Sequence, residues 1–178
     1  MGFDIELRDE LHDTHGDRWH FYKADVLQMP FEEESFDMVF YYHVIEHVPD
    51  PARSLSEVAR VLRPQGALFV GTPNRARLIG YIGSRTSLKN KLLWNWADWK
   101  YRLRGRFRNE FGAHAGFTEQ ELHQLMQPYF GEIVWLTRDY LLSKYAQKLP
   151  KPLLQFIAWR PVRTVLAPAI YAWAIKPT

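Results

Sequence analysis

The chain of 178 residues contains no cysteine. Disulfide bonds, thiolate metal sites and cysteine nucleophiles are therefore excluded. The sequence also lacks any run of about 18 apolar residues, so no membrane-spanning helix is predicted. No apolar segment follows a basic start, as it would in a secretory signal. These absences predict a cytoplasmic protein, and the length suits a single domain with one hydrophobic core.

Charge is distributed unevenly along the chain. The formal net charge is +3, yet the segment from 75 to 108 holds ten Lys and Arg residues against one acidic residue, Asp98, which gives it +9. The rest of the chain therefore carries −6. A basic segment on an acidic body indicates a local interaction surface.

The middle of the chain predicts a strand, a helix and a second strand. The apolar run Met38–Phe40 is typical of a strand that is buried on both faces. In Ala52–Leu62 the apolar residues recur at helical spacing, and Asp50 precedes them as an N-cap. Ala67–Gly71 is a second apolar run that predicts the next strand. Together these elements form one βαβ unit of an α/β fold.

This unit carries a resemblance to a known family. The blocks that carry it, in the expected order and spacing, are Phe36–Val39, His43–Pro51, Arg60–Gly66 and Thr72–Asn74. They resemble the middle of a class I S-adenosylmethionine (SAM) dependent methyltransferase of the type 11 group, which includes ubiquinone and menaquinone biosynthesis methyltransferases. The resemblance implies a SAM-dependent methyltransferase with a Rossmann-like α/β fold: a parallel sheet with helices on both faces and a C-terminal antiparallel hairpin. Gln65 stands where the family usually has glycine, so a small backbone cost is expected there.

The first βα unit of that family has no counterpart before Asp4. Its glycine-rich turn lets the backbone approach the methionine end of SAM. Its strand lies at the centre of the family's sheet, so a sheet without it would have two exposed edges. Three interpretations follow: an N-terminally truncated methyltransferase, a catalytically inactive relative that acts as a binding partner, or a protein whose missing part comes from another chain. A single domain over 1–178 is expected.

The resemblance assigns SAM-binding roles to five residues. Asp4 would accept hydrogen bonds from the ribose hydroxyls, since a carboxylate can accept from two at once. Asp25 would accept from the adenine amino group, and the backbone N–H of Val26 would donate to a ring nitrogen. Tyr42 and His43 would form the wall beside the methionine end. The residues alone also allow Asp4 to be an ordinary terminal residue and Asp25 to be a turn cap.

Two histidines, His43 and His114, are candidate catalytic residues. Methyl transfer from a sulfonium requires alignment and, for a hydroxyl or amine acceptor, removal of a proton. A neutral imidazole can take that proton. The resemblance places His114 on a loop that faces the substrate, and fixing that loop is the alternative role.

The pattern formed by His43, Glu46 and His47 also occurs in zinc proteases. That chemistry needs the pattern on a continuous helix and a third ligand downstream. Val48 and Pro49 interrupt any helix here, so a protease is not predicted. Some quinone-type O-methyltransferases hold a divalent metal with an acid and histidines at these positions, but here the first residue is histidine. No metal site is predicted, and the sequence leaves open whether these three residues bind one.

Segment 75–110 is predicted to be a basic and aromatic lid insertion. Its apolar residues Leu92, Trp96, Trp99 and Leu103 recur at helical spacing, so one face of the predicted helix is apolar and the other basic. Such a helix can lie on an anionic membrane surface, bind RNA, or cover the protein core. The first interpretation favours a small or lipid-linked acceptor. The second would make the protein an RNA methyltransferase, and no other feature of the sequence supports nucleic-acid binding.

The C-terminal part completes the predicted fold. Thr118 and Glu121 have the spacing of a capping box for a helix over 119–129. Strands are predicted at 132–136 and 169–177, and the resemblance pairs them antiparallel.

Between these strands, segment 140–167 is predicted to be a helical insertion. Its prolines divide two short helices that are apolar on one side and basic on the other. Neither is long enough to span a membrane. The basic segments 75–108 and 148–166 together predict a peripheral position at the inner face of a membrane.

Overall fold

The structure, a computed structural model, describes residues 2–4, 21–81 and 86–178, with side chains from residue 23 onward. Its main sheet has four strands in the spatial order β3 (Phe36–Tyr42), β4 (Leu62–Pro73), β6 (Ala169–Ile175) and β5 (Glu132–Trp135). Strands β3 and β4 are parallel, whereas β6 is antiparallel to both of its neighbours. The predicted C-terminal antiparallel pairing is therefore confirmed. A separate parallel pair is formed by β1 (Gly2–Asp4) and β2 (Phe21–Lys23).

Helix α1 (Pro51–Val61) connects β3 to β4, as the sequence predicts. The carboxylate of Asp50 caps it by accepting a hydrogen bond from the backbone N–H of Arg53 at 3.0 Å. After the helix, Gln65 has a φ of 63°, which is the left-handed conformation that glycine adopts most easily. The backbone cost expected at this position is thus present.

One face of the four-stranded sheet carries the hydrophobic core. Helices α1 and α3 (Glu119–Met126) pack on this face, and the predicted capping box of Thr118 and Glu121 begins α3. The side chains that are fully buried there include Leu55, Val58, Leu68, Val70, Leu122 and Met126. These residues come from the two helices and from alternate positions of β4, so burial follows the two-residue period of a strand.

The opposite face is covered unequally. Met38 and Phe40 point to it and keep 47% and 66% of their surface exposed, so the prediction that β3 is buried on both faces is wrong for this face. Helix α4 (Thr137–Tyr145) covers only one end, where the rings of Tyr140 and Tyr171 lie 4.3 Å apart. The sequence of a short apolar strand is the same whether one or both of its faces are buried, so it cannot distinguish the two cases.

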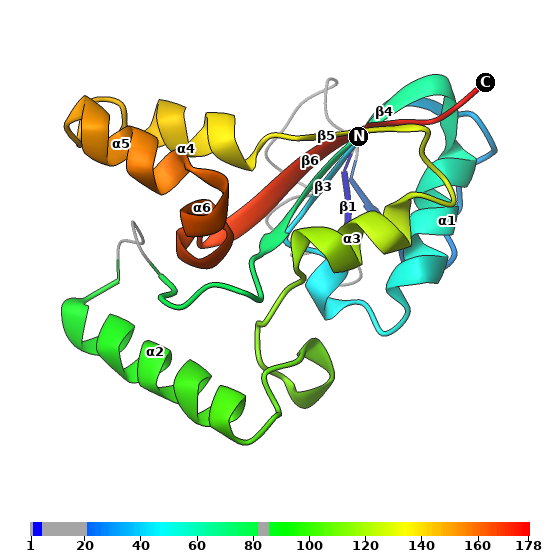
Figure 1. The fold of residues 1–178 in the computed structure, drawn as a ribbon. Helices are drawn as coiled ribbons and strands as arrows, with labels where there is room; N and C mark the ends of the chain where they lie inside the picture. The colour runs from blue at the N-terminus through cyan, green and yellow to red at the C-terminus, as the bar shows by residue number, and fades with distance from the viewer. Residues whose placement is uncertain (1, 5–20, 82–85) are drawn as a thin grey trace.

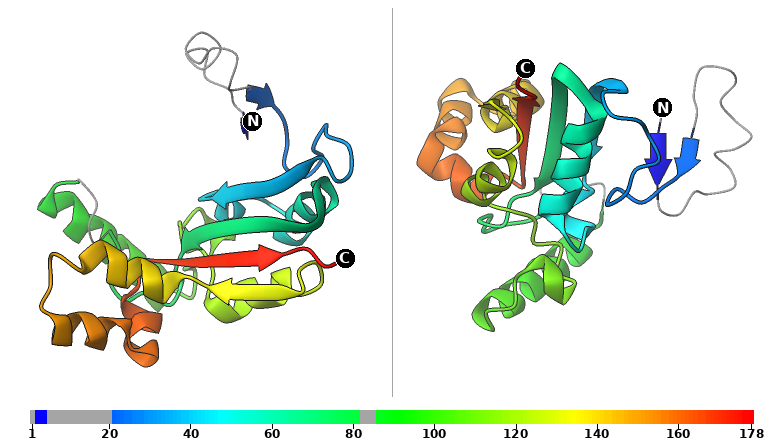
Figure 2. Two further views of the ribbon diagram at one scale, coloured as in Figure 1. Left: turned by 90° about the horizontal axis from the view of Figure 1, so that it is seen from above. Right: turned by 90° about the vertical axis from the view of Figure 1, so that its right-hand side faces the viewer.

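Three helices lie between β5 and β6 and gather at one end of the sheet (Figure 2). The two short ones, α5 (Lys151–Ala158) and α6 (Arg160–Leu166), were predicted, and α4 was not. Two single-turn 3-10 helices occur as well, η3 (Ile45–His47) and η4 (Asn109–Phe111).

Helix α2 (Leu88–Leu103) stands apart from the sheet (Figure 1). None of its residues is buried, and Leu92 and Trp96 keep 64% and 59% of their surface exposed. The interpretation that its apolar face covers the core is therefore wrong. Among the described helices, none combines the length and the apolarity required to cross a membrane.

Candidate functional site

The carboxyl ends of β3 and β4 meet at one edge of the sheet because the two strands are parallel. Two neighbouring cavities lie beside this edge, with volumes of about 450 Å³ and 700 Å³. The larger one is bordered by both strand ends, α2 and α4, and we refer to it as the strand-end cavity. The residues that line it include Tyr42, His43, His47, His114, Tyr140 and Lys144. Two of the predicted SAM-binding residues and both candidate catalytic histidines thus lie around one space.

Strand β4 passes closely between two aromatic rings at this edge. A Cβ atom on Gly71 would lie 2.7 Å from the ring of Tyr42 and 3.0 Å from the ring of Tyr171. Any larger residue would push these rings apart. Glycine at position 71 therefore allows the aromatic wall of the strand-end cavity to form.

His43 is fixed by both its backbone and its ring. Its φ of 53° is unusual for a residue with a Cβ, and its N–H donates to the carbonyl of Gly71 at 2.8 Å. Its Nδ1 lies 2.8 Å from Oε1 of Glu46, a carboxylate with only 5% of its surface exposed. The hydroxyl of Thr72 donates to the other oxygen of Glu46 at 3.0 Å. These contacts hold the imidazole against the end of β3.

The environment of Glu46 favours its charged form. Burial acts to raise the pKa of Glu46, but hydrogen bonds from His43, from its own backbone N–H and from Thr72 outweigh burial and lower the pKa. A carboxylate accepts hydrogen bonds and cannot donate them, so Nδ1 of His43 is the protonated nitrogen of this pair. Nε2 of His43 is then the nitrogen available to accept a proton.

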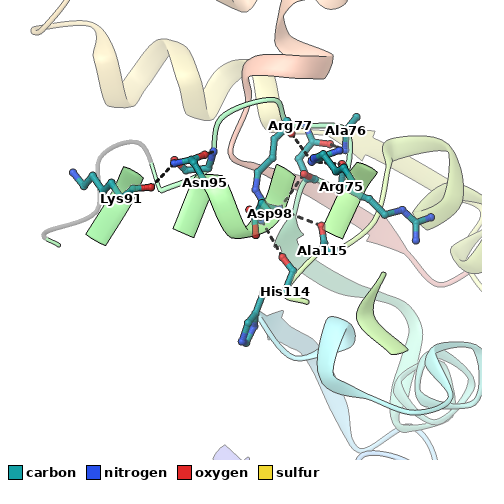
Figure 3. Close-up of polar contacts among 12 residues, drawn as sticks. Arg75, Ala76, Arg77, Lys91, Asn95, Asp98, His114 and Ala115 are labelled. Carbon is teal, nitrogen blue, oxygen red and sulfur yellow. Dashed lines mark hydrogen bonds and ion pairs between the residues drawn. The ribbon is translucent and has the colours of Figure 1, made fainter. Parts of the chain in front are cut away.

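His114 reaches the strand-end cavity from the loop between η4 and α3. Its ring lies 4.8 Å from the ring of His47 in an edge-to-face arrangement. Arg77, which is 96% buried, donates to the backbone carbonyls of His114 and Ala115 at 3.0 and 3.1 Å and pairs with Asp98 of α2 at 3.1 Å (Figure 3). Arg77 therefore ties the segment after β4 to the histidine loop and to α2. No local motif in the sequence indicates this role for Arg77.

Polar contacts hold the rest of α2 in place. The side-chain amide of Asn95 accepts from the N–H of Gly80 at 2.7 Å and donates to the carbonyls of Gly80 and Lys91 (Figure 3). The rings of Tyr81 and Trp94 lie 4.9 Å apart and line the strand-end cavity. Part of the predicted lid segment 75–110 thus forms one wall of this cavity.

The residues assigned to the adenosine side of SAM lie elsewhere. Oδ1 of Asp25 accepts a hydrogen bond from the N–H of Leu27 at 2.9 Å, which is the turn-capping role. Val26 is half-buried and packs against the core. Asp4 ends β1, and its side chain lies outside the described part of the chain. The SAM-binding roles of these residues stay predictions.

Sequence reasoning also missed the polar group on α4. Nζ of Lys144 donates to the hydroxyl of Tyr140 at 2.8 Å, and the buried Tyr171 lies beside Tyr140. Burial acts to raise the pKa of Tyr140, but hydrogen bonds from Lys144 and Tyr171 lower it. The four-residue spacing of Tyr140 and Lys144 was the available signal, since such residues share one face of a helix.

The pattern of His43, Glu46 and His47 does not lie on one continuous helix. His43 follows a strand, and only the next residues form the single turn of η3. Nε2 of His47 lies 4.0 Å from Oε1 of Glu46. Within residues 2–4, 21–81 and 86–178, no group of three or more His, Cys, Asp or Glu side chains is arranged to hold a metal ion.

Comparisons with known proteins agree with this fold. Residues 4–70 match the sequence model of a methyltransferase domain family. A ubiquinone biosynthesis O-methyltransferase of Marinobacter nauticus is 31% identical over 128 residues, which cover 66% of this chain and 53% of that protein. A probable S-adenosylmethionine-dependent methyltransferase of Mycobacterium tuberculosis is 47% identical over 53 residues, which cover 30% of this chain and 19% of that protein. The chain thus matches about half or less of the length of these relatives.

A solved structure shows the same fold. The CurJ carbon methyltransferase superposes with a TM-score of 0.51 at 15% sequence identity, over 89% of this chain and 35% of that chain. This superposition shows that the chain has a Rossmann-like α/β fold. Residues 4–70 are thus similar to a methyltransferase domain, and 128 residues resemble a ubiquinone biosynthesis O-methyltransferase, which agrees with the resemblance to the type 11 group found in the sequence.

Proposed function

We propose that the protein transfers the methyl group of SAM to an oxygen, nitrogen or carbon atom of an acceptor held in the strand-end cavity. The observation that carries this proposal is the position of the cavity at the carboxyl ends of β3 and β4, within a chain whose residues 4–70 match a methyltransferase domain. Open α/β sheets bind their ligands at this edge. The acceptor is a small or lipid-linked molecule, by analogy with the ubiquinone biosynthesis relatives.

The described residues fit parts of SAM. When bound, SAM supplies an electrophilic methyl group on a positively charged sulfur. The partly exposed ring of Tyr42 borders the cavity and suits a neighbouring cation. The exposed carboxylate of Asp25 suits the amino group of adenine. His43 would line the methionine end.

Proton removal from the acceptor would fall to His43 or His114. His43 is oriented by Glu46, which leaves Nε2 as the proton acceptor. His114 enters the same cavity on the loop fixed by Arg77. Glu46 and Arg77 are positioning residues in this scheme, because they act through the histidines.

Calorimetric titration with S-adenosylhomocysteine tests the proposal. We expect the chain to bind one molecule of it. Asp25→Ala should weaken the affinity about tenfold, which corresponds to about 1.4 kcal/mol. Asp37→Ala is the matched control, since Asp37 is an exposed carboxylate that pairs with Arg63. No binding by the chain would contradict SAM binding by these residues alone. It would favour the other interpretations: a truncated methyltransferase, a protein completed by another chain, or a catalytically inactive relative that acts as a binding partner.

Methyl transfer from labelled SAM then separates the two histidines. His43→Gln and His114→Gln should leave the affinity for S-adenosylhomocysteine within about threefold, since neither would bind the cofactor through a charge. The variant that lacks the general base should have a kcat about 10²–10⁴-fold lower, since this is the usual contribution of general base catalysis. If both variants are as active as the unchanged protein, neither histidine removes a proton from the acceptor.

We also propose that the protein docks on an anionic membrane surface through α2 and the segment around α5. The apolar side chains of α2 are exposed next to Lys89, Lys91 and Lys100. On and after α5 the large exposed side chains are Leu153, Phe156 and Trp159. Lys151 and Arg160 lie beside them. Exposed apolar residues that alternate with basic ones suit the boundary between anionic headgroups and acyl chains.

Co-sedimentation with vesicles tests the membrane proposal. Vesicles with phosphatidylglycerol should bind the protein, and vesicles of phosphatidylcholine alone should bind it weakly. A double variant, Leu92→Ser with Trp96→Ser, should reduce the binding without unfolding the protein, because neither side chain is buried. Equal binding to both vesicle types would contradict the role of the basic residues. Binding to single-stranded RNA in place of vesicles would favour the RNA methyltransferase interpretation.

A further inference from the structure

We propose that Lys144 and Tyr140 of α4 bind an anionic group of the methyl acceptor. This inference names a property of the acceptor and rests on the proposed function. The two side chains line the strand-end cavity together with His43, and Nζ of Lys144 donates to the hydroxyl of Tyr140 at 2.8 Å. The acceptor would therefore carry its anionic group at the α4 side and present its nucleophilic atom at the histidine side.

The charge of Lys144 is not balanced by a neighbouring acid. Among the described residues, no carboxylate lies within 4.0 Å of its nitrogen. Arg77, the other strong cation of the cavity wall, pairs with Asp98 at 3.1 Å. Glu46, an acid on the same wall, is already bound by His43 and Thr72. An ammonium group at a partly buried site without an acid partner favours an anionic ligand.

Lys144 also keeps its positive charge at neutral pH. Burial acts to lower the pKa of Lys144, but the hydrogen bond to Tyr140 and the neighbouring phenol groups outweigh burial and raise the pKa. One N–H group of the ammonium donates to the hydroxyl of Tyr140. The remaining N–H groups can donate to an oxygen of a ligand in the cavity.

An aromatic wall connects the two polar sides of the cavity. The ring of Tyr42 lies 4.3 Å from the ring of His43 and 6.3 Å from the ring of Tyr171, with which it is stacked. The ring of Tyr171 lies 4.3 Å from that of Tyr140. A continuous row of rings therefore runs from His43 to the partner of Lys144. Such a wall suits a planar aromatic or unsaturated molecule between the anionic group and the nucleophile.

The test compares two probes that differ in charge and share their ring system, 2-naphthoate and 2-naphthamide. Calorimetry on the full chain at pH 7.5 should show that naphthoate binds at least tenfold more tightly than naphthamide. Lys144→Met should abolish this preference by weakening naphthoate and leaving naphthamide unchanged, and Lys144→Arg should retain it. Tyr140→Phe should weaken naphthoate by a smaller factor, since it removes a hydroxyl and no charge.

Lys148→Met is the matched control. Lys148 is exposed, follows the same helix and is not part of the cavity wall, so its variant should bind naphthoate as the unchanged protein does. The proposal is overturned if naphthoate and naphthamide bind equally or not at all. It is also overturned if Lys144→Met and Lys148→Met have the same effect.

A parallel titration with S-adenosylhomocysteine separates this inference from the proposed function. Lys144→Met should leave that affinity unchanged. If S-adenosylhomocysteine does not bind while the preference for naphthoate depends on Lys144, the methyltransferase proposal fails and the anion site remains. If S-adenosylhomocysteine binds and the preference is absent, only the anion site fails.

Discussion

Helices α1 and α2 are attached to the protein by different interactions. Helix α1 buries Ser54, Leu55, Val58, Ala59 and Val61 against the sheet. Helix α2 contains three Trp residues, yet it buries none of its side chains. Among the described residues, it contacts the rest of the protein through hydrogen bonds, the ion pair of Asp98 with Arg77 and the contact between the rings of Trp94 and Tyr81. The comparison indicates that α1 belongs to the cooperative core, whereas α2 can detach while the core stays folded.

The largest effect is expected from a substitution that removes packing under α1. Leu55 is fully buried, so Leu55→Ala should lower the free energy of unfolding by about 3–5 kcal/mol. Leu92→Ala in α2 is the matched control and should change it by less than about 0.5 kcal/mol, because Leu92 is exposed. Urea denaturation followed by circular dichroism measures both. Similar losses in the two variants would mean that α2 is part of the core.

A substitution at Arg77 should detach α2 selectively. Arg77→Met leaves the carboxylate of Asp98 half-buried without its partner and removes the donors to the histidine loop, at a cost of about 3 kcal/mol. Amide hydrogen exchange should then lose protection over 88–103 and keep it in α1. Adding Asp98→Asn should restore part of the protection, because the unpaired charge is gone. Loss of protection in both helices would contradict their independence.

Two carboxylates, the buried Glu46 and the half-buried Asp98, should respond to pH in opposite directions. Hydrogen bonds lower the pKa of Glu46 against the effect of burial, so its stabilising contribution is present above pH 4.5 and is lost as the pH falls below that value. Burial raises the pKa of Asp98 in α2, so its contribution is largest at acidic pH and is lost as the pH rises above 3.8. The two carboxylates should thus give stability curves of opposite slope.

Stability measured between pH 3 and pH 7 distinguishes these two contributions, with the range chosen around the ordinary pKa values of about 4 for carboxylates. Glu46→Gln should flatten the loss of stability on acidification by about 1 kcal/mol, the net contribution of a typical hydrogen bond. Asp98→Asn should act in the opposite direction on the pH dependence of amide protection in α2, because we expect α2 to open without unfolding the core. Parallel curves for the two variants would show that the carboxylates do not differ in this way.

The sequence predicted the elements whose signals are local. The βαβ unit, the cap at Asp50, the capping box at Thr118 and the terminal strands all follow from residue spacing within about a dozen positions. Helix α4 was missed because its apolar residues Tyr140, Leu141 and Leu142 are consecutive and therefore spread around the helix. The exposed face of β3 was missed because the residues of an apolar strand do not indicate which other segments pack against it.

The candidate site was predicted in part for the same reason. His43 and His114 were found from motifs, and the fold brings both to one cavity. The pairing of Arg77 with Asp98 and the approach of Lys144 to the aromatic wall depend on contacts between distant segments. No local spacing encodes such contacts, so only the folded structure reveals them.

The smallest expected effect concerns the turns that follow the two helices. Gln65, after α1, and Gly105, after α2, both have left-handed backbone angles, with φ of 63° and 65°. In this conformation a residue with a Cβ is destabilised by about 1–2 kcal/mol. Glycine avoids this strain but loses about 0.5–1 kcal/mol more in chain entropy on folding. Gln65→Gly should therefore stabilise the protein by about 0.5–1 kcal/mol.

Gly105→Ala makes the opposite change at the other helix. A Cβ there would meet no heavy atom within 4 Å, so the cost of about 1 kcal/mol comes from the backbone alone. Because we expect α2 to open without unfolding the core, this cost should appear as faster amide exchange in its last turn and not as a lower urea midpoint. Gln65→Gly should instead raise the midpoint, since Gln65 lies within β4 of the core. A shift of the midpoint by Gly105→Ala equal in size to that of Gln65→Gly would place both helices in one cooperative unit.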